Sequence, residues 1–153
     1  MRTYRFKTQK ELGIEGERQF TERYQALYNP IKSTTDLSFD FTLRTKTKCE
    51  LKTDSYLMDS TPNYFMERWA NGNRTKDGGP WRALNDSVPI FVYFFINNQE
   101  FHWFRTEKLI IALNELVINT DPALISVKSD EWNVWGYLIP RKDIENIVKI
   151  DSF

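Results

Sequence analysis

Two carboxylates and a lysine occur within one short stretch of the chain, FDFTLRTKTKCELK. Asp40 lies in one run of alternating apolar and polar residues, and Glu50 and Lys52 lie in the next. Magnesium is usually held in proteins by one or two carboxylates, together with water and substrate phosphate. Such an ion lowers the pKa of a bound water, and a nearby ammonium can stabilise the charge that develops on a phosphate. These residue types therefore favour the hydrolysis of phosphodiester bonds.

Strand periodicity determines whether these side chains can meet. Residues 37–43 (LSFDFTL) alternate strictly, which predicts a half-buried strand with Asp40 on its polar face. Residues 47–54 predict the next strand, in which Glu50 and Lys52 emerge on the same face, about 7 Å apart. A short polar turn joins the two strands, so we expect them to pair as a hairpin that brings Asp40 toward Glu50.

Three further groups could contribute oxygen atoms to this site. The backbone carbonyl of Leu51 could add a third oxygen beside the two carboxylates. Asp36 shares the polar strand phase with Asp40 and is the alternative metal ligand. Glu17 falls on the apolar stripe of its predicted helix, where a carboxylate is costly unless it is paired or bound to metal. We therefore expect Glu17 to reach the same site.

The remaining pattern predicts alternating helices and strands. Together they indicate an α/β fold with a central mixed β-sheet flanked by helices, in a single domain over residues 1–153. The predicted elements are a helix at 13–28, a strand at 63–69, a loop at 71–81, a strand at 89–96 in the middle of the sheet, a pairing strand at 100–105, a helix at 107–118 capped by Thr106, a strand at 134–139 and a short helix at 141–148.

Composition excludes several classes of protein. Hydrophobic residues make up 41% of the 153 residues and aromatic residues 15%, which is enough for a packed core. No apolar run approaches the roughly 18–20 residues of a membrane span, and the basic N-terminus lacks the apolar stretch of a signal peptide. The single cysteine, Cys49, and the single histidine, His102, disfavour a disulfide framework, a structural zinc site and a Cys/His nucleophile pair. We expect Cys49 to be a packing residue and His102 to be a packed or surface histidine, in a reducing, cytoplasmic setting.

Charge is balanced overall but clustered locally. The 21 basic and 21 acidic residues give a net charge of zero, which argues against a protein that coats DNA non-specifically. Basic residues nevertheless gather near the proposed site, where they could contact phosphates or lie as solvated surface charges. The expected DNA-binding residues are Arg44, Lys46 and Lys48 in the hairpin turn, Arg74, Lys76 and Arg82 around the 71–81 loop, and Trp81, which could stack on an unpaired base.

Glu17, Asp40 and Glu50-Leu51-Lys52, in this order on helix, strand and strand, resemble the PD-(D/E)XK nuclease superfamily. The resemblance implies a restriction-endonuclease-like core of helix, three strands, helix and strand. It also implies that the aspartate and the glutamate bind Mg²⁺ or Mn²⁺ and that Lys52 assists the attacking water. Phe39 stands where the proline that names the motif would be.

A second stretch is similar to small phage and archaeal resolvase-type members of that superfamily. Residues 61–67 (TPNYFME) resemble a T-G-N-x-F-x-E segment, with Pro62 where glycine is usual. A Gly-Gly loop and an aromatic-rich strand follow in those proteins, as Gly78-Gly79 and residues 90–96 do here. The closing YLIPRKDI of residues 137–144 adds to the likeness. Glu67 could supply a further acidic contact or lie on the surface.

We therefore expect a metal-dependent DNA endonuclease selective for junctions or branched DNA, similar to a Holliday junction resolvase. The expected catalytic residues are Asp40, Glu50, Lys52 and Glu17, with Mg²⁺ (or Mn²⁺ in its place) held by Asp40, Glu50, Glu17 and the carbonyl of Leu51. A homodimer would allow paired cuts. The expected location is the cytoplasm of a bacterial, archaeal or phage-infected cell. The alternative is a non-catalytic nucleic-acid-binding or interaction module on the same fold.

Overall fold

The structure is a computed structural model that describes residues 4–130 and 132–152. Within this part of the chain, four helices accompany a six-stranded mixed sheet (order β1-β2-β3-β5-β6-β9) and a three-stranded antiparallel sheet (order β4-β8-β7). The elements span these residues: α1 Gln9–Tyr28, β1 Ile31–Lys32, β2 Phe41–Thr42, β3 Lys48–Asp54, β4 Asn63–Trp69, α2 Gly79–Asn85, β5 Ile90–Phe95, β6 Glu100–Arg105, α3 Thr106–Thr120, β7 Leu124–Ser129, β8 Trp132–Pro140, the 3₁₀ helix η1 Arg141–Ile147 and β9 Lys149–Ser152.

The predicted α/β class is confirmed, but the prediction of one central sheet is wrong. The strands predicted at 63–69 and 134–139 leave the main sheet and pair with each other as β4 and β8. β7, which the sequence pattern did not predict, pairs with the other side of β8. None of the helices in the described residues combines the length and the apolar sequence that a membrane span requires.

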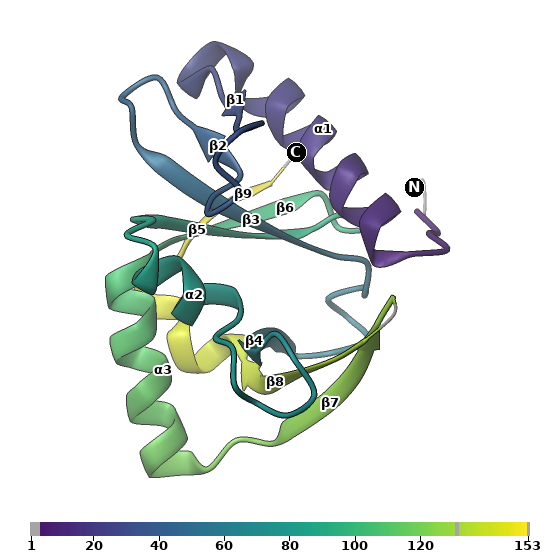
Figure 1. Cartoon of the computed structure of the whole chain (residues 1–153), viewed down its shortest axis with the longest axis vertical. Helices are drawn as coiled ribbons and strands as arrows, with labels where there is room; N and C mark the ends of the chain where they lie inside the picture. Colours follow the sequence, from purple (N-terminus) through teal and green to yellow (C-terminus); the bar gives the residue numbers. More distant parts are fainter. Residues whose placement is uncertain (1–3, 131, 153) are drawn as a thin grey trace.

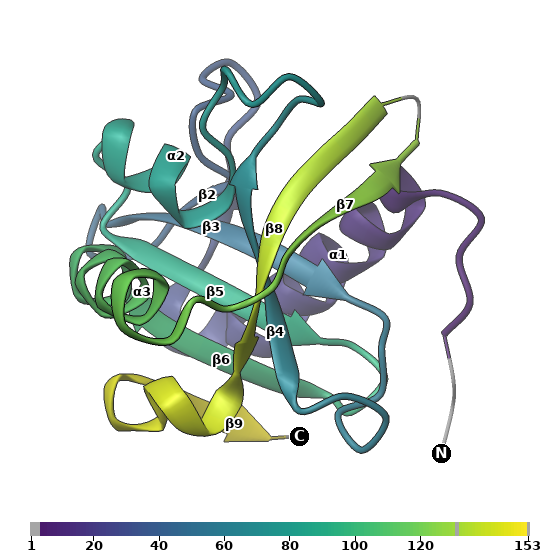
Figure 2. The same ribbon diagram turned by 90° about the horizontal axis from the view of Figure 1, so that it is seen from below.

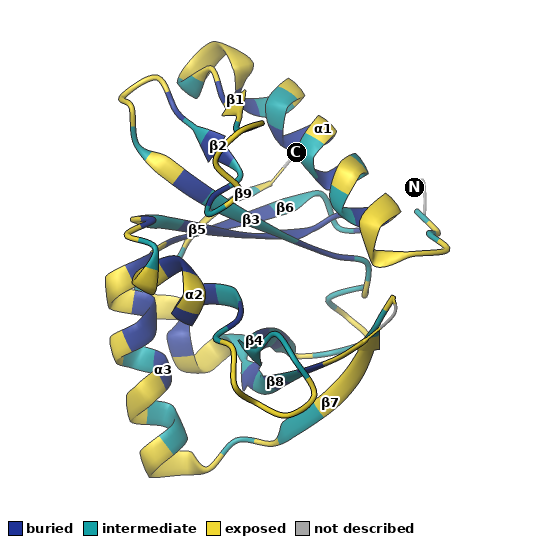
Figure 3. Cartoon of the chain, in the orientation of Figure 1, coloured by how far each residue is buried: buried dark blue, intermediate teal, exposed yellow. Residues whose placement is uncertain are grey.

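The six-stranded sheet separates two apolar cores. Helix α1 covers one face, while α2, α3 and the second sheet cover the other (Figure 1). Strand β5 contributes to both cores, because Val92 and Phe94 pack on the α1 side and Tyr93 and Phe95 on the opposite side. Figure 3 shows the resulting band of buried residues along β5 and β6. The prediction that this strand lies in the middle of the sheet is therefore confirmed.

The second sheet crosses the first steeply (Figure 2). Hydrogen bonds of two buried tyrosines connect the two sheets. The hydroxyl of Tyr93 on β5 donates to Asp54 and accepts a hydrogen bond of 3.1 Å from the backbone nitrogen of Phe65 on β4. The hydroxyl of Tyr64, also on β4, lies 2.6 Å from Nδ1 of His102. His102 is 1% exposed and is therefore a packed histidine, as expected.

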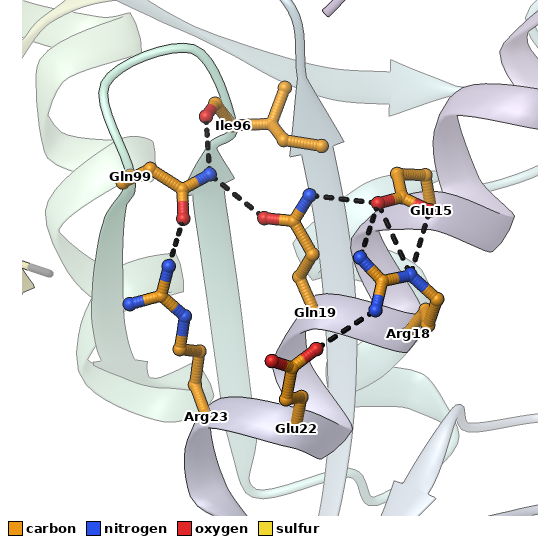
Figure 4. A network of polar contacts seen from close by, with 7 residues as sticks. All are labelled: Glu15, Arg18, Gln19, Glu22, Arg23, Ile96 and Gln99. Carbon is orange, nitrogen blue, oxygen red and sulfur yellow. Dashed lines mark hydrogen bonds and ion pairs between the residues drawn. The ribbon is translucent and has the colours of Figure 1, made fainter. Parts of the chain in front are cut away.

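Helix α1 is held over the sheet by a chain of polar side chains (Figure 4). Buried Gln19 donates to Glu15 at 2.9 Å and accepts from Nε2 of Gln99 at 2.8 Å. Gln99 lies in the turn between β5 and β6, and its side chain also accepts a hydrogen bond of 2.6 Å from Arg23. The helix begins earlier than predicted, at Gln9, because Thr8 accepts a hydrogen bond of 3.1 Å from the nitrogen of Glu11 and so caps it.

The predicted cap by Thr106 is wrong, because Thr106 is the first residue of α3 and its side chain makes no capping hydrogen bond. Two other local predictions fail for identifiable reasons. The strand predicted at 37–43 shrinks to Phe41–Thr42, because the side chain of Asp36 accepts hydrogen bonds from the backbone nitrogen and the hydroxyl of Ser38 and forms a turn instead. Leu37 is consequently exposed. Part of the loop predicted at 71–81 folds as the start of α2, in which Pro80 occupies the first turn, where proline is favourable.

Candidate active site

Asp40 lies just before β2 and is fixed against β3 by two hydrogen bonds. Its backbone nitrogen donates to the carbonyl of Cys49 at 3.1 Å, and its Oδ2 accepts from the nitrogen of Leu51 at 2.8 Å. The predicted hairpin is confirmed, since β2 and β3 pair antiparallel with Phe41 opposite Cys49. Asp40 therefore lies beside the strand that carries the other proposed residues.

The backbone N–H and C=O groups of Leu51 point to the edge of β3 at which Asp40 lies. The N–H and C=O of one residue point to the same edge of a strand. Because the N–H of Leu51 reaches Asp40, its carbonyl is also directed to this edge and away from β5. This orientation is the one that the expected third oxygen ligand requires.

Glu50 faces the opposite core from Cys49 and lies next to the carboxyl group of Asp40. Burial of Glu50 raises its pKa to about 9, and the charge of Asp40 and a hydrogen bond with it contribute to the rise. The positive charges of Arg82 and Lys32 act in the opposite direction. At neutral pH, therefore, Glu50 keeps its proton when no cation is bound.

Lys52 and Glu67 complete a small cavity beside Glu50. The cavity has a volume of about 120 Å³, and its charged lining residues are Glu50, Lys52, Glu67 and Arg82. Glu67 comes from β4 in the second sheet. Burial raises the pKa of Glu67, while the charge of Lys52 lowers it. The alternation of residues 63–69 could have indicated the strand face on which the Glu67 side chain lies. Only the crossing of the two sheets brings this side chain to the cavity beside Glu50.

Two glycines allow the start of α2 to close around Glu67. The nitrogen of Gly79 donates to Oε2 of Glu67 at 3.2 Å. A Cβ atom at Gly78 would lie 2.3 Å from the same Oε2, and one at Gly79 would lie 2.5 Å from the Glu67 backbone carbonyl. Gly79 also has a positive φ of 48°, which favours glycine. The backbone at Gly78 and Gly79 therefore fixes the position of the Glu67 carboxylate.

Glu17 does not reach the cavity, contrary to the expectation. The buried residues of α1 include Phe20 and Tyr24 but not Glu17, which is partly exposed. Its Oε1 lies 3.1 Å from Nζ of Lys32, and the same ammonium lies 3.2 Å from Oδ1 of Asp40. Glu17 is thus connected to the site only through Lys32, a residue that the sequence pattern did not single out.

Asp36 and Asp40, the two alternative metal ligands, lie in different surroundings. Asp36 is exposed, and its hydrogen bonds with Ser38 lower its pKa. Nothing in these contacts connects Asp36 with Glu50. Asp40 is the carboxylate that lies next to Glu50.

The donor set at this site fits magnesium or manganese. Among residues 4–130 and 132–152 there is no group of three or more His, Cys, Asp or Glu side chains arranged to hold a metal, so Glu17 does not form the predicted set with Asp40 and Glu50. Magnesium needs only one or two carboxylates from the protein. Asp40 and Glu50 supply these, the carbonyl of Leu51 faces the same edge, and a divalent cation would take the place of the proton on Glu50. One oxygen of Asp40 would have to exchange Lys32 for the metal.

The expected DNA-binding residues are distributed unevenly around the site. Arg82 lines the cavity and also donates to the carbonyl of Leu37 at 3.1 Å. The other basic residues are exposed: Arg44 and Lys46 lie between β2 and β3, Lys48 is the first residue of β3, and Arg74 and Lys76 lie between β4 and α2. The stacking role expected of Trp81 does not fit, because the side chain is 7% exposed in the core and its Nε1 donates to Asn114 at 3.1 Å.

Searches against protein-family models, curated proteins and solved structures found no match for this chain.

Proposed function

We propose that this protein is a Mg²⁺-dependent deoxyribonuclease that hydrolyses phosphodiester bonds of DNA, with Asp40, Glu50 and Lys52 as its catalytic residues. The observation that carries the proposal is the adjacent, half-buried pair of Asp40 and Glu50. Two adjacent carboxyl groups, one with a pKa raised to about 9, are costly for folding and form a strong cation site when deprotonated. Lys52 and Arg82 at the same cavity provide positive charge for a phosphate.

The order of the elements supports the likeness to the PD-(D/E)XK superfamily. Helix α1, strands β1, β2 and β3, helix α2 and strand β5 follow one another as helix, three strands, helix and strand, with β4 inserted before α2. The three strands form an antiparallel meander, and β5 pairs parallel with β3. A restriction-endonuclease-like core is therefore part of the proposal.

The chain's own groups have separable tasks in this reaction. Asp40 and Glu50 would hold the cation, which when bound activates water and neutralises charge on the phosphate. Lys52, two residues after Glu50 on the same strand face, lies where its ammonium can orient the attacking water or stabilise the developing charge. Arg82 would contact a phosphate oxygen from α2. Lys32 competes with the cation at Asp40 and so keeps this carboxylate paired before the metal binds.

The decisive experiment compares Glu50→Ala and Lys52→Ala with the wild type on labelled linear duplex, single strand, four-way junction and flap DNA. We expect Mg²⁺-dependent cleavage by the wild type and none by either variant, with circular dichroism unchanged. Asp36→Ala is the matched control and should cut normally. Full activity of either site variant would exclude the assignment.

The same substrate panel tests the remaining parts of the proposal. Preference for the junction or flap substrate would support a structure-selective endonuclease. DNA binding without Mg²⁺-dependent cleavage would favour the non-catalytic module instead. A homodimer stays a prediction, which solution mass in the presence of the junction checks.

A further inference from the structure

A second cavity lies beside the small one that is lined by Glu50. It has a volume of about 270 Å³ and shares Lys52, Phe65 and Glu67 with the first cavity. Beyond these shared residues it extends toward Asp54 and Asn63. The two cavities are thus neighbours that share part of their walls, and together we call them the β3–β4 cleft.

The walls of the β3–β4 cleft are alternate residues of two strands. Strand β3 contributes Glu50, Lys52 and Asp54, and β4 contributes Asn63, Phe65 and Glu67. Side chains on one strand face repeat every second residue, so each wall is a row with a spacing of about 7 Å. The acidic end of the cleft lies at Glu50 and Glu67, and an aromatic ring follows one step along.

Beyond Phe65 the cleft has both polar and apolar lining residues. Leu12 of α1 and four aliphatic residues of β7 and β8 line it, and these are Ile125, Val127, Val134 and Leu138. The tip of the Phe65 ring packs against Gly136, where a Cβ atom would lie only 2.4 Å from the ring. Close packing at Gly136 therefore restricts the Phe65 ring, and the amide of Asn63 is the nearest polar group along the β4 wall.

We propose that the β3–β4 cleft binds one unpaired nucleotide of a DNA strand, with the base stacked on Phe65. This inference rests on the proposed nuclease function, which places a phosphodiester at Glu50 and Lys52. Lys52 and Phe65 line both cavities, so a sugar would span the step from a phosphate at Lys52 to a base at Phe65. The cavity is smaller than the roughly 300–1,000 Å³ of pockets that bury drug-sized ligands, so it suits one base rather than a base pair.

A cleft for one unpaired base favours substrates that contain single-stranded or unpaired DNA. Enzymes that enclose a single base act on single strands or must first take the base out of the duplex, and this is easiest where pairing is already lost. The protein should therefore prefer a flap, a gap or a junction with an unpaired nucleotide next to the cut over a continuous duplex. Stacking on an aromatic ring tolerates any base, so little sequence preference is expected.

The test measures binding without metal, so that no strand is cut. Short single-stranded DNA containing 2-aminopurine is titrated with the wild type, Phe65→Leu and Phe65→Trp, beside a hairpin duplex of the same sequence. The wild type should bind the single strand more tightly and quench the 2-aminopurine fluorescence. Phe65→Leu should lose about tenfold in affinity for the single strand only, and Phe65→Trp should retain it.

Two controls make the result specific. Trp132→Leu removes an exposed aromatic side chain outside the cleft and should bind as the wild type does. Thermal melting of each variant checks that the fold is intact, and leucine is chosen because it keeps most of the apolar contact with Gly136. Wild-type affinity in a folded Phe65→Leu variant, or 2-aminopurine fluorescence that binding does not change, would overturn the inference.

Failure of this inference is distinguishable from failure of the proposed function. If Glu50→Ala abolishes Mg²⁺-dependent cleavage but Phe65→Leu binds the single strand normally, the nuclease assignment stands and the base pocket does not. If no substrate is cut but Phe65→Leu weakens binding, the cleft is a single-strand site on a non-catalytic protein.

Discussion

Oδ2 of Asp40 accepts a hydrogen bond of 2.8 Å from the backbone nitrogen of Leu51. This bond fixes a carboxylate from the irregular segment before β2 onto the edge of β3, directly beside Glu50. It also orients the Leu51 carbonyl to the same edge. The central pair of the candidate site is therefore held by backbone geometry rather than by flexible side chains, and its properties can be tested residue by residue.

The stability of the metal-free protein should fall as pH rises. Glu50 has a folded-state pKa of about 9 against an ordinary value of 4.5, so between these values the folded state holds a proton that the unfolded state releases. The unfolded state binds fewer protons in this window, and the free energy of unfolding therefore decreases with pH. Denaturant unfolding across this range should show the decline, and Glu50→Gln should flatten it. An unchanged slope in the variant would exclude Glu50 as its source.

Magnesium binding should release a proton from this pair. Below about pH 9 the cation displaces the proton of Glu50, so affinity should increase with pH and level off near that value. Isothermal titration in two buffers of different ionisation enthalpy measures the proton count. A pH-independent affinity with no proton release would mean that the cation binds elsewhere.

Replacement by asparagine should lower the cleavage rate at Asp40 but not at Asp36. Asp40→Asn retains an acceptor for the nitrogen of Leu51 but removes the charge beside Glu50, so cleavage should fall by about a hundredfold or more while folding persists. Asp36→Asn changes only the turn at Ser38 and should cut normally. Initial rates on a flap substrate decide between them, and equal loss in both variants would reopen the choice of ligand.

Glu17 should be a positioning residue. It contacts Lys32 and not the carboxyl pair, so Glu17→Gln should lower the cleavage rate by about tenfold, well short of the loss in Glu50→Gln. Because a freed Lys32 would pair more fully with Asp40, the variant should also need a higher Mg²⁺ concentration for half-maximal rate. A loss as complete as that of Glu50→Gln, with no change in the Mg²⁺ requirement, would restore Glu17 to the catalytic set.

Two glycines of α1 provide a matched test of how this helix packs on β3. A Cβ atom at Gly16 would lie 1.9 Å from Oγ1 of Thr53, whereas one at Gly13 meets nothing within 4 Å. Gly16→Ala should therefore destabilise the protein by about 1–3 kcal/mol through overpacking. Gly13→Ala should stabilise it by about 0.5–1 kcal/mol, because alanine loses less backbone entropy in a helix. Urea unfolding of both variants measures the difference.

Trp81 should contribute to stability and not to DNA binding. Trp81→Phe removes the hydrogen bond to Asn114 and should cost about 1 kcal/mol in the free energy of unfolding. Its affinity for single-stranded DNA should equal that of the wild type, since the ring is buried between α2 and its neighbours. A selective loss of DNA affinity at unchanged stability would contradict this placement.

Local patterns predicted the elements that have strong periodicity. The alternation around Glu50 and Lys52 gave β3 and its facing directions, and the apolar run at 89–96 gave a central strand. Strand 37–43 was overestimated because Asp36 makes side-chain hydrogen bonds with the turn, which compete with strand pairing. Helix α2 was missed because Gly78 and Gly79 resemble loop residues in sequence, although they allow a close approach to Glu67.

The sequence by itself determined the α/β class, the hairpin of Asp40 with Glu50 and the shared face of Glu50 and Lys52, because these follow from local periodicity and short-range pairing. Only the tertiary structure decided that β4 belongs to a second sheet, that Glu67 enters the site and that Glu17 stays outside it behind Lys32. Each of these depends on contacts between segments far apart in the chain, and a residue's local pattern carries no information about which distant surface will cover it.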